Sequence, residues 1–218
     1  MNFSINFRQK LYTSKQPWLM GILNITPDSF YSASRLGSDS VLLKKAEQML
    51  REGADILDIG GYSSRPDATD ISIEEELQRV ITAIELVVKN FPKALISADT
   101  FRSKVAIAAI DAGAGMINDI SAGRLDKEMF NCLAKLKVPY VLMHMRGTPQ
   151  NMQTLCNYND VVKDTVFELS EKLEQLKQLG IKDVIIDPGI GFAKTMEQNF
   201  EIINNLQAYK VFEKPLMV

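Results

Sequence analysis

Short apolar runs and longer amphipathic stretches alternate along the chain from about residue 18 onward. Seven runs have strand character, and several are apolar throughout, which is typical of strands buried on both faces of a parallel sheet. The predicted strands are Trp18–Leu23, Asp55–Ile59, Ala94–Ala98, Gly115–Ile120, Pro139–Met143, Val184–Asp187 and Pro215–Val218.

The intervals between these strands carry helical patterns. Apolar residues recur there at spacings of three and four, which predicts an apolar stripe along one face of each helix. Ser72 and Glu75 form a capping box that opens one helix, and Gly113 stands where a C-terminal capping glycine is expected. The predicted helices lie around residues 41–50, 77–88, 105–110, 126–137, 162–176 and 196–209.

The strict alternation of strand and helix predicts a parallel α/β architecture. An open doubly wound sheet and a closed (β/α)8 barrel both fit this order. A barrel typically needs about 250 residues, and this chain stops at residue 218, directly after the seventh predicted strand. No linker or low-complexity segment interrupts the pattern, so we expect a single domain over residues 1–218.

Polar side chains stand at or just past the end of six successive predicted strands. In a (β/α) barrel the active site is built at that face, whereas a doubly wound sheet uses one crevice. Asp and Asn also suit turns and helix caps, so each one alone could be structural. Together they suggest a ligand rich in N–H donors, a metal ion, or both. The residues are Asn24, Asp58, Asp99, Asn118–Asp119, His144 and Asp187.

Composition excludes several classes of function. The chain is 46% hydrophobic and 24% charged with a net charge of −2, and no run of Lys or Arg appears. That balance argues against nucleic acid or an anionic membrane as the partner. The sequence has no signal-peptide pattern and no stretch near the roughly 18 apolar residues of a membrane span. We therefore expect a cytoplasmic protein in which Cys132 and Cys156 are reduced thiols.

Three of the predicted strand-to-helix loops are long, which usually marks functional loops. They cover about residues 24–38, 60–73 and 144–158. The first opens within GILNITPDSF (Gly21–Phe30) and the second within DIGGYSSRP (Asp58–Pro66). Shorter motifs follow in order: ADT at 98–100, IND at 117–119, MHMRGTP at 143–149 and DPGIGF at 187–192.

With these motifs, the chain resembles the dihydropteroate synthases over nearly all of its length after residue 18. The resemblance implies a TIM-type (β/α)8 barrel, of which about seven strands and six helices are present. It implies a transferase of folate biosynthesis, which condenses 6-hydroxymethyl-7,8-dihydropterin diphosphate with p-aminobenzoate. The products would be 7,8-dihydropteroate and diphosphate, with Mg²⁺ as the cofactor, and the enzyme would be a sulfonamide target.

The resemblance also assigns residue roles. It implies a pterin pocket formed by Asp58, Asp99, Asn118, Met143 and Asp187. It places Mg²⁺ and the diphosphate at Asn24, the diphosphate also at Arg65, and p-aminobenzoate beside Ser64, Pro66 and Phe192, with Phe30 covering the site. The catalytic residues would be Asn24, Arg65 and Asp99. A carboxylate-lined pocket suits the N–H donors of a pterin, and the fork of an Arg side chain suits phosphate oxygens.

Structural interpretations stay open for several positions outside the carboxylates. Met143 could be core packing, and His144, the single histidine, could be a hydrogen-bonded structural residue. Arg146 could be a solvated charge or a second phosphate contact. The glycines of Gly189–Gly191 could bind phosphate or only permit a turn.

The sequence departs from the family pattern in two places. Tyr62 stands where Glu is usual, and Ser64 replaces Thr, so we expect altered substrate or sulfonamide affinity. The chain also ends at Val218, before the family's Ser-Arg-Lys segment and Arg-x-His motif, and we expect it to be an incomplete chain. A homodimer is possible. Two alternatives remain: a non-catalytic pterin-binding paralogue, and a pterin-dependent methyltransferase, against which the Thr-Pro-Asp-Ser-Phe and Ser-Arg-Pro loops argue.

Overall fold

The computed structural model of the chain describes residues 3–25, 35–65 and 70–218. Within them, six parallel strands form one sheet whose spatial order follows the sequence, from β3 to β8. The strands are β3 (Met20–Asn24), β4 (Ile56–Gly60), β5 (Leu95–Asp99), β6 (Met116–Asp119), β7 (Tyr140–Met143) and β8 (Val184–Asp187). Sequential order of neighbouring parallel strands is the topology of a (β/α) barrel rather than of a doubly wound sheet.

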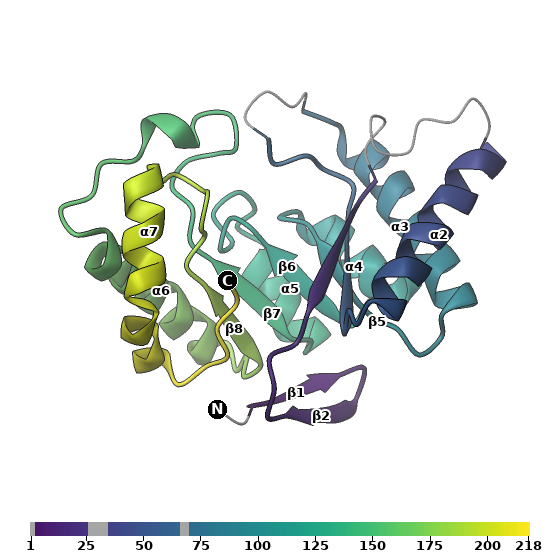
Figure 1. Cartoon of the computed structure of the whole chain (residues 1–218), viewed down its shortest axis with the longest axis horizontal. Coiled ribbons are helices and arrows are strands. Elements are labelled where there is room, and N and C mark those ends of the chain that lie inside the picture. Colours follow the sequence, from purple (N-terminus) through teal and green to yellow (C-terminus); the bar gives the residue numbers. More distant parts are fainter. Residues whose placement is uncertain (1–2, 26–34, 66–69) are drawn as a thin grey trace.

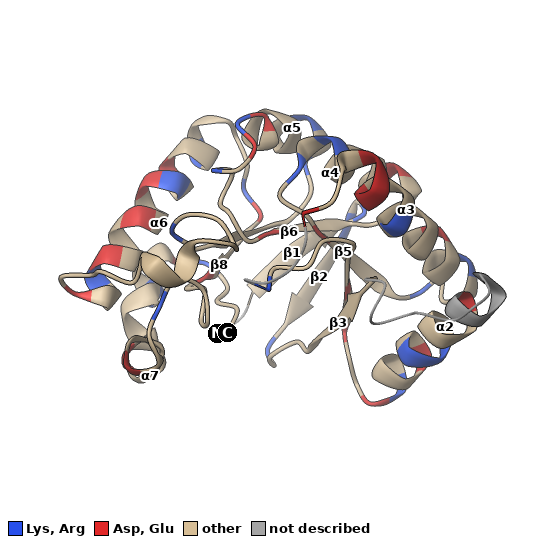
Figure 2. Ribbon diagram, turned by 90° about the horizontal axis from the view of Figure 1, so that it is seen from above, with Lys and Arg blue, Asp and Glu red and all other residues tan. Residues whose placement is uncertain are grey.

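Helices follow the strands and lie outside them. They are α2 (Arg35–Arg51), α3 (Ile73–Asn90), α4 (Ser103–Ala112), α5 (Met129–Leu136), α6 (Val161–Gln178) and α7 (Met196–Asn204), with 3₁₀ turns η1 (Met152–Thr154) and η2 (Leu206–Phe212). Seen from above, they form an outer arc around the strands, with α2 at one end and α7 at the other (Figure 2). The predicted TIM-type barrel fold is confirmed.

The first six predicted strands agree with the observed ones to within two residues at each end. The seventh predicted run is represented by a single parallel bridge between Leu216 and Ile186. The Ile186 N–H donates to the Pro215 carbonyl at 2.9 Å, and the Met217 N–H donates to the Ile186 carbonyl at 2.8 Å. Residues after η2 therefore continue the sheet beyond β8.

Local sequence signals set several helix ends. Ser72 caps α3 by accepting a hydrogen bond from the Glu75 N–H at 3.1 Å, and the three acidic residues in the first turn suit the helix dipole. Gly113 closes α4 in the left-handed conformation, with φ 116°. A reciprocal capping box between Thr195 and Gln198 opens α7.

An N-terminal hairpin, which the sequence patterns did not predict, closes one end of the barrel. Strands β1 (Phe3–Phe7) and β2 (Lys10–Ser14) pair antiparallel. The turn residues Arg8 and Gln9 both have positive φ, 50° and 64°, as a two-residue hairpin turn requires. In Figure 1 the hairpin lies beneath the sheet.

The hairpin packs on a layer of inward-facing apolar side chains. Ile5 and Phe7 form one buried cluster with residues of β4, β6, β7 and β8, namely Ile56, Met116, Val141 and Ile185. Phe7 lies so close to the sheet that a Cβ on Gly115 would stand 2.3 Å from its ring. Because strand side chains alternate between faces, the intervening residues pack outward against the helices in a separate, larger cluster, which includes Leu57, Ile96 and Leu142.

No helix in the described part of the chain is long and apolar enough to cross a membrane. The cytoplasmic location and the possible homodimer stay predictions from the sequence.

Replacing Phe7 with Ala should remove the centre of the hairpin packing. Phe7 is 1% exposed, and truncation of a buried Phe typically costs about 3–5 kcal/mol. We expect the free energy of unfolding in urea to fall by that amount. Leu11→Ala, in the same hairpin but 67% exposed, is the matched control and should change it by less than about 0.5 kcal/mol. Equal effects of the two changes would show that the hairpin does not seal the barrel.

Candidate functional site

The next layer of inward-facing side chains, toward the carboxyl ends of the strands, is polar. Asp58 of β4 is in register with Ser97 of β5, and the Asn118 side chain of β6 donates to Asp58 Oδ2 at 2.8 Å. Two buried oxygens of this layer, Asp58 Oδ1 and Asn118 Oδ1, have no hydrogen-bond partner within the geometric limits among the described residues, and the Ser97 hydroxyl lies beside Asp58 and counteracts the rise of its pKa. Buried polar atoms are nearly always hydrogen-bonded, so this layer is built to receive a ligand that carries donors.

Two more carboxylates join Asp58 on the inner face. Asp99 ends β5, and Asp187 ends β8 in register with Met143. Burial raises the pKa of Asp58 above its usual value. Burial, followed by the charge of Asp58, raises the pKa of Asp99 well above its usual value, and burial raises that of Asp187 to about 6. N–H donors from a ligand would favour the charged forms and so offset this cost.

At the carboxyl end of the strands, two side-chain oxygens flank Gly60. A Cβ at this position would stand 3.0 Å from Asp99 Oδ2 and 3.4 Å from Asn24 Oδ1, so a side chain here would crowd the gap between them. Carboxylate and amide oxygens suit Mg²⁺, which commonly uses one or two protein ligands beside waters and substrate phosphates. The described residues contain no cluster of three or more His, Cys, Asp or Glu side chains that could hold a metal alone.

The predicted p-aminobenzoate and diphosphate residues follow the end of β4. Ser64 is partly buried and Arg65 is exposed, and the Ser63 hydroxyl accepts a hydrogen bond from the Arg65 N–H at 3.5 Å. Pro66 and Phe30 lie outside the described residues.

The remaining predicted wall residues belong to an apolar cluster at the carboxyl end. Met143 is 3% exposed and clusters with Met145, Met152 and Ala193, and Phe192 packs against them. Met143 also projects from the inner face, since it is in register with Asp187. The packing and pocket interpretations of Met143 are therefore compatible.

Two strand-end residues do not face the barrel interior, contrary to the sequence expectation. Asp119 points outward because neighbouring residues of a strand project to opposite faces. It accepts hydrogen bonds from Ser121 and Tyr140 hydroxyls, each at 2.7 Å, and from the Gly123 N–H at 2.8 Å. His144 is buried between Glu168, 3.1 Å from its Nε2, and Lys194, 3.1 Å from its Nδ1. Burial lowers the pKa of His144 to about 4, which agrees with a structural role.

Arg146 is held within the protein. Its Nε donates to Glu168 at 2.8 Å, one Nη donates to the Asn157 carbonyl at 2.6 Å, and the guanidinium stacks 3.8 Å from the centre of the Tyr158 ring. It is therefore not the solvated charge that one interpretation of the sequence allowed.

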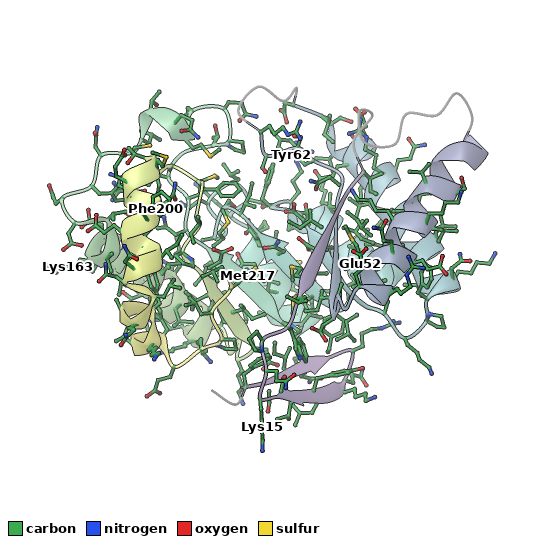
Figure 3. The ribbon with its side chains drawn as sticks, in the orientation of Figure 1. Lys15, Glu52, Tyr62, Lys163, Phe200 and Met217 are labelled. Carbon is green, nitrogen blue, oxygen red and sulfur yellow. The ribbon has the colours of Figure 1, made fainter. Side chains whose placement is uncertain are left out.

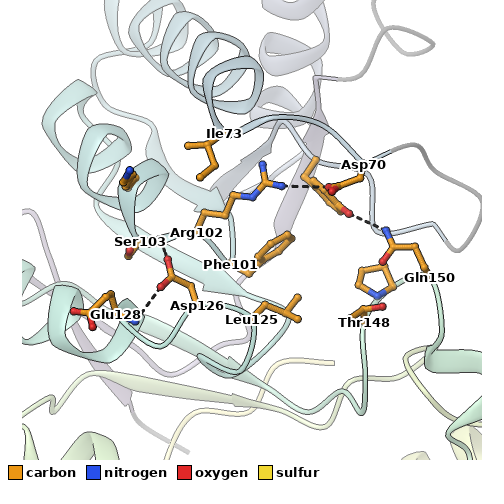
Figure 4. A pocket seen from close by; sticks show the side chains of 13 residues that line it. Asp70, Ile73, Phe101, Arg102, Ser103, Leu125, Asp126, Glu128, Thr148 and Gln150 are labelled. Atoms are coloured by element: carbon orange, nitrogen blue, oxygen red, sulfur yellow. Dashed lines mark hydrogen bonds and ion pairs between the residues drawn. The ribbon is translucent and has the colours of Figure 1, made fainter.

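Tyr62 turns toward neighbouring loops. Its hydroxyl accepts a hydrogen bond from Gln150 at 2.9 Å, and its ring meets Phe101 edge-on at 5.0 Å between centres. It lines a hollow of about 740 Å³ formed by the loops after β4, β5, β6 and β7, whose lining does not include the inner carboxylates (Figure 4). In Figure 3, Tyr62 lies at the end of the molecule opposite Lys15, which follows the hairpin.

A buried glutamate supports these loops from behind. Glu76 of α3 is fully buried and accepts from the Thr100 hydroxyl at 2.6 Å and from Arg102 at 2.8 Å. Arg102 also reaches Asp70 at 3.2 Å across the loop after β4. Sequence patterns did not single out Glu76, because a charged residue within an acidic helix start is expected to be exposed.

Replacing Asp187 with Asn should stabilise the unliganded protein at neutral pH. A carboxyl whose folded-state pKa is raised from 3.8 to about 6 loses stability as pH rises through that interval, because the folded state disfavours its charge. We expect Asp187→Asn to raise the free energy of unfolding at pH 8 by up to about 3 kcal/mol and to leave it unchanged near pH 3.5. Asp111→Asn, at an exposed position, is the control. A destabilised Asp187→Asn variant at pH 8 would contradict this account of the carboxyl.

Comparison with known proteins agrees with this geometry. Residues 20–218 match the family described as pterin binding enzymes. The folic acid synthesis protein fol1 of Pneumocystis carinii is 45% identical over 212 residues, which cover 96% of this chain and 28% of that protein. The dihydropteroate synthase of Synechocystis is 41% identical over 206 residues, which cover 94% of this chain and 71% of that protein.

A solved structure is similar over nearly the whole chain. The dihydropteroate synthase of Xanthomonas albilineans, solved with 4-aminobenzoic acid, superposes with a TM-score of 0.90 at 37% identity, covering 99% of this chain and 77% of that one. The chain thus spans less than a third of the fungal protein and about three quarters of the bacterial ones. It belongs to the pterin-binding enzymes and, within them, to the dihydropteroate synthase family.

Proposed function

We propose that this chain carries the pterin and p-aminobenzoate site of a dihydropteroate synthase. The enzyme would join 6-hydroxymethyl-7,8-dihydropterin diphosphate to p-aminobenzoate and release diphosphate. The observation that carries the proposal is a pair of acceptors inside the barrel, Asp58 Oδ1 and Asn118 Oδ1, for which the described residues provide no donor. Both oxygens are buried, and a flat heterocycle with amino and ring N–H groups would supply donors to them.

Pterin binding follows from the chemistry of this layer. The 2-amino group and ring N–H of a pterin are donors, while ionised carboxylates only accept. Asp58, Asn118 and Asp187 offer acceptors from strands on different sides of the barrel, so they can fix the edge of one planar ring. Met143 would supply an apolar contact at the same level. The 4-aminobenzoic acid found with the Xanthomonas synthase supports an aromatic amine as the second substrate.

The reaction asks the protein for positioning and charge stabilisation. The amine nitrogen of p-aminobenzoate bonds to the pterin methylene carbon, the C–O bond to diphosphate breaks, and the amine loses a proton. If C–O cleavage runs ahead of attack, the methylene cation is delocalised into the pterin ring. Holding that ring, binding the leaving group and excluding water are then the main tasks.

The leaving group would be bound at the carboxyl end of β3 and β4. Arg65 is exposed at the start of the second long loop and can donate two parallel hydrogen bonds to phosphate oxygens. Asn24 and Asp99, on either side of Gly60, would hold Mg²⁺, which when bound neutralises charge on the diphosphate. Phe192, in the loop after β8, would form part of the apolar wall beside p-aminobenzoate.

Activity tests this proposal directly. We expect the full-length protein to form dihydropteroate from both substrates with Mg²⁺. Asp58→Asn should lower kcat/KM at least 100-fold, because its amide would turn donors toward the donors of the pterin; Asp111→Asn should leave it unchanged. Pterin binding without turnover would identify a non-catalytic paralogue. Methyl transfer to a corrinoid without dihydropteroate formation would identify a methyltransferase. Equal activity of Asp58→Asn and wild type would refute the assigned pocket.

Tyr62 should affect the affinity of the site for p-aminobenzoate. Glu at this position would lose the hydrogen bond from Gln150 and the ring contact with Phe101, and its charge would lie near Asp70. Since these contacts anchor the loop that carries Ser64 and Arg65, we expect Tyr62→Glu to change the KM for p-aminobenzoate and the inhibition constant of a sulfonamide several-fold in the same direction. Tyr62→Phe, which removes only the hydroxyl, should have a smaller effect. Unchanged constants in Tyr62→Glu would show that the departure from the family pattern is neutral.

A further inference from the structure

The loop after β8 adopts a left-handed backbone that is strained at Ala193. Gly189, Gly191 and Ala193 all lie in the left-handed region, with φ of 70°, 86° and 52°. Glycine tolerates this conformation, while alanine rarely adopts it. Gly189 also passes so close to β7 that a Cβ would overlap the His144 carbonyl oxygen, at 1.8 Å. Strained conformations persist where the surrounding structure over-determines them, so this loop needs an anchor.

Lys194 supplies contacts suited to that role. It is 4% exposed, and its Nζ lies beneath the loop, 2.9 Å from the carbonyl oxygens of both Gly189 and Phe192. The same Nζ lies 3.1 Å from His144 Nδ1 and 3.4 Å from the His144 carbonyl. An ammonium has three donors and no acceptor, and here four acceptors surround it.

A chain of hydrogen bonds connects this ammonium to α6. With Nδ1 of His144 accepting from Lys194, the hydrogen-bond network assigns the ring proton to Nε2, which donates to Glu168. Glu168 in turn binds Arg146. Burial lowers the pKa of Lys194 to about 7, while the charges of Asp187 and Glu168 counteract it. The ammonium is thus held between the loop after β8 and the end of β7.

Two predicted substrate contacts depend on the backbone that Lys194 fixes. The Gly189 N–H donates to Asp187 Oδ1 at 2.7 Å, so the position of Gly189 orients this carboxylate. The Phe192 carbonyl binds Lys194 directly, and the Phe192 ring packs on the cluster that contains Met143. One buried side chain therefore controls a residue on the pterin side and a residue on the p-aminobenzoate side.

We propose that Lys194 is a positioning residue that holds the Asp187–Lys194 loop in its strained form and thereby aligns Asp187 and Phe192 for the two substrates. The assignment of those substrates rests on the proposed synthase function; the anchoring of the loop does not. Lys194 itself touches no substrate in this scheme, because it lies under the loop and is buried by His144, Gly189 and Phe192.

Hydrogen exchange and kinetics of Lys194→Met in the full-length protein test the proposal. Met keeps the length of the side chain and removes every donor. We expect amides of residues 187–194 to exchange at least tenfold faster, with no change in peptides covering β4. The KM values of both substrates should rise about tenfold while kcat falls less than threefold. Lys172→Met is the control, and it should change neither measurement. Lys172 is less buried than Lys194, and its Nζ lies 5.7 Å from the centre of the Phe130 ring.

Lys194→Gln provides a second variant that retains two N–H donors for the loop carbonyls. It should give exchange rates between those of wild type and Lys194→Met. Unchanged loop exchange in both variants would overturn the proposal. A uniform increase in exchange across the chain, or failure of both variants to fold, would also overturn it, because Lys194 would then act in global stability. If the wild-type protein has no synthase activity, the exchange experiment still decides the anchoring of the loop, and only the substrate assignment falls.

Discussion

Asp58 and Asn118 share one hydrogen bond in the interior of the barrel, and each keeps a buried acceptor without a donor in the described part of the chain. Buried acceptors without partners each cost free energy of folding, typically about 1–3 kcal/mol. The fold offsets that cost with apolar packing on two sides. The hairpin and the lower inner layer lie beneath, and the helices cover the outer face of every strand. Apolar packing on two sides therefore stabilises the barrel despite these unsatisfied acceptors.

At two places, a glutamate of a helix supports the loops around this interior by accepting hydrogen bonds. On one side Glu76 of α3 binds Thr100 and Arg102, and on the other Glu168 of α6 binds His144 and Arg146. In both, a helix glutamate faces inward and receives donors from the strand-to-helix loops. The two differ in charge balance: burial raises the pKa of Glu76, whereas hydrogen bonds from His144 and Arg146 outweigh burial and lower that of Glu168 to about 2.

Much of the architecture could be predicted from the sequence, because apolar periodicity is strong in buried parallel strands and in amphipathic helices. The motifs at the strand ends predicted which face carries the site. The sequence could not separate Asn118 from Asp119, since which of two adjacent residues faces inward depends on strand register. The hairpin was not predicted, because its strands are short and mostly polar on their outer face. Lys194 was not singled out either, because nothing in the sequence marks a lysine as buried. Its role depends on carbonyl groups that only the folded loop brings together.

The hairpin has a consequence for the order in which the protein is assembled. Phe7 is synthesised long before its packing partners Val141 and Ile185, which belong to β7 and β8. The hairpin can therefore pack against β7 and β8 only after both strands have been synthesised. Until then, the apolar side chains of the hairpin and of the inner layer remain exposed together, and chaperone binding during synthesis would act at this stage.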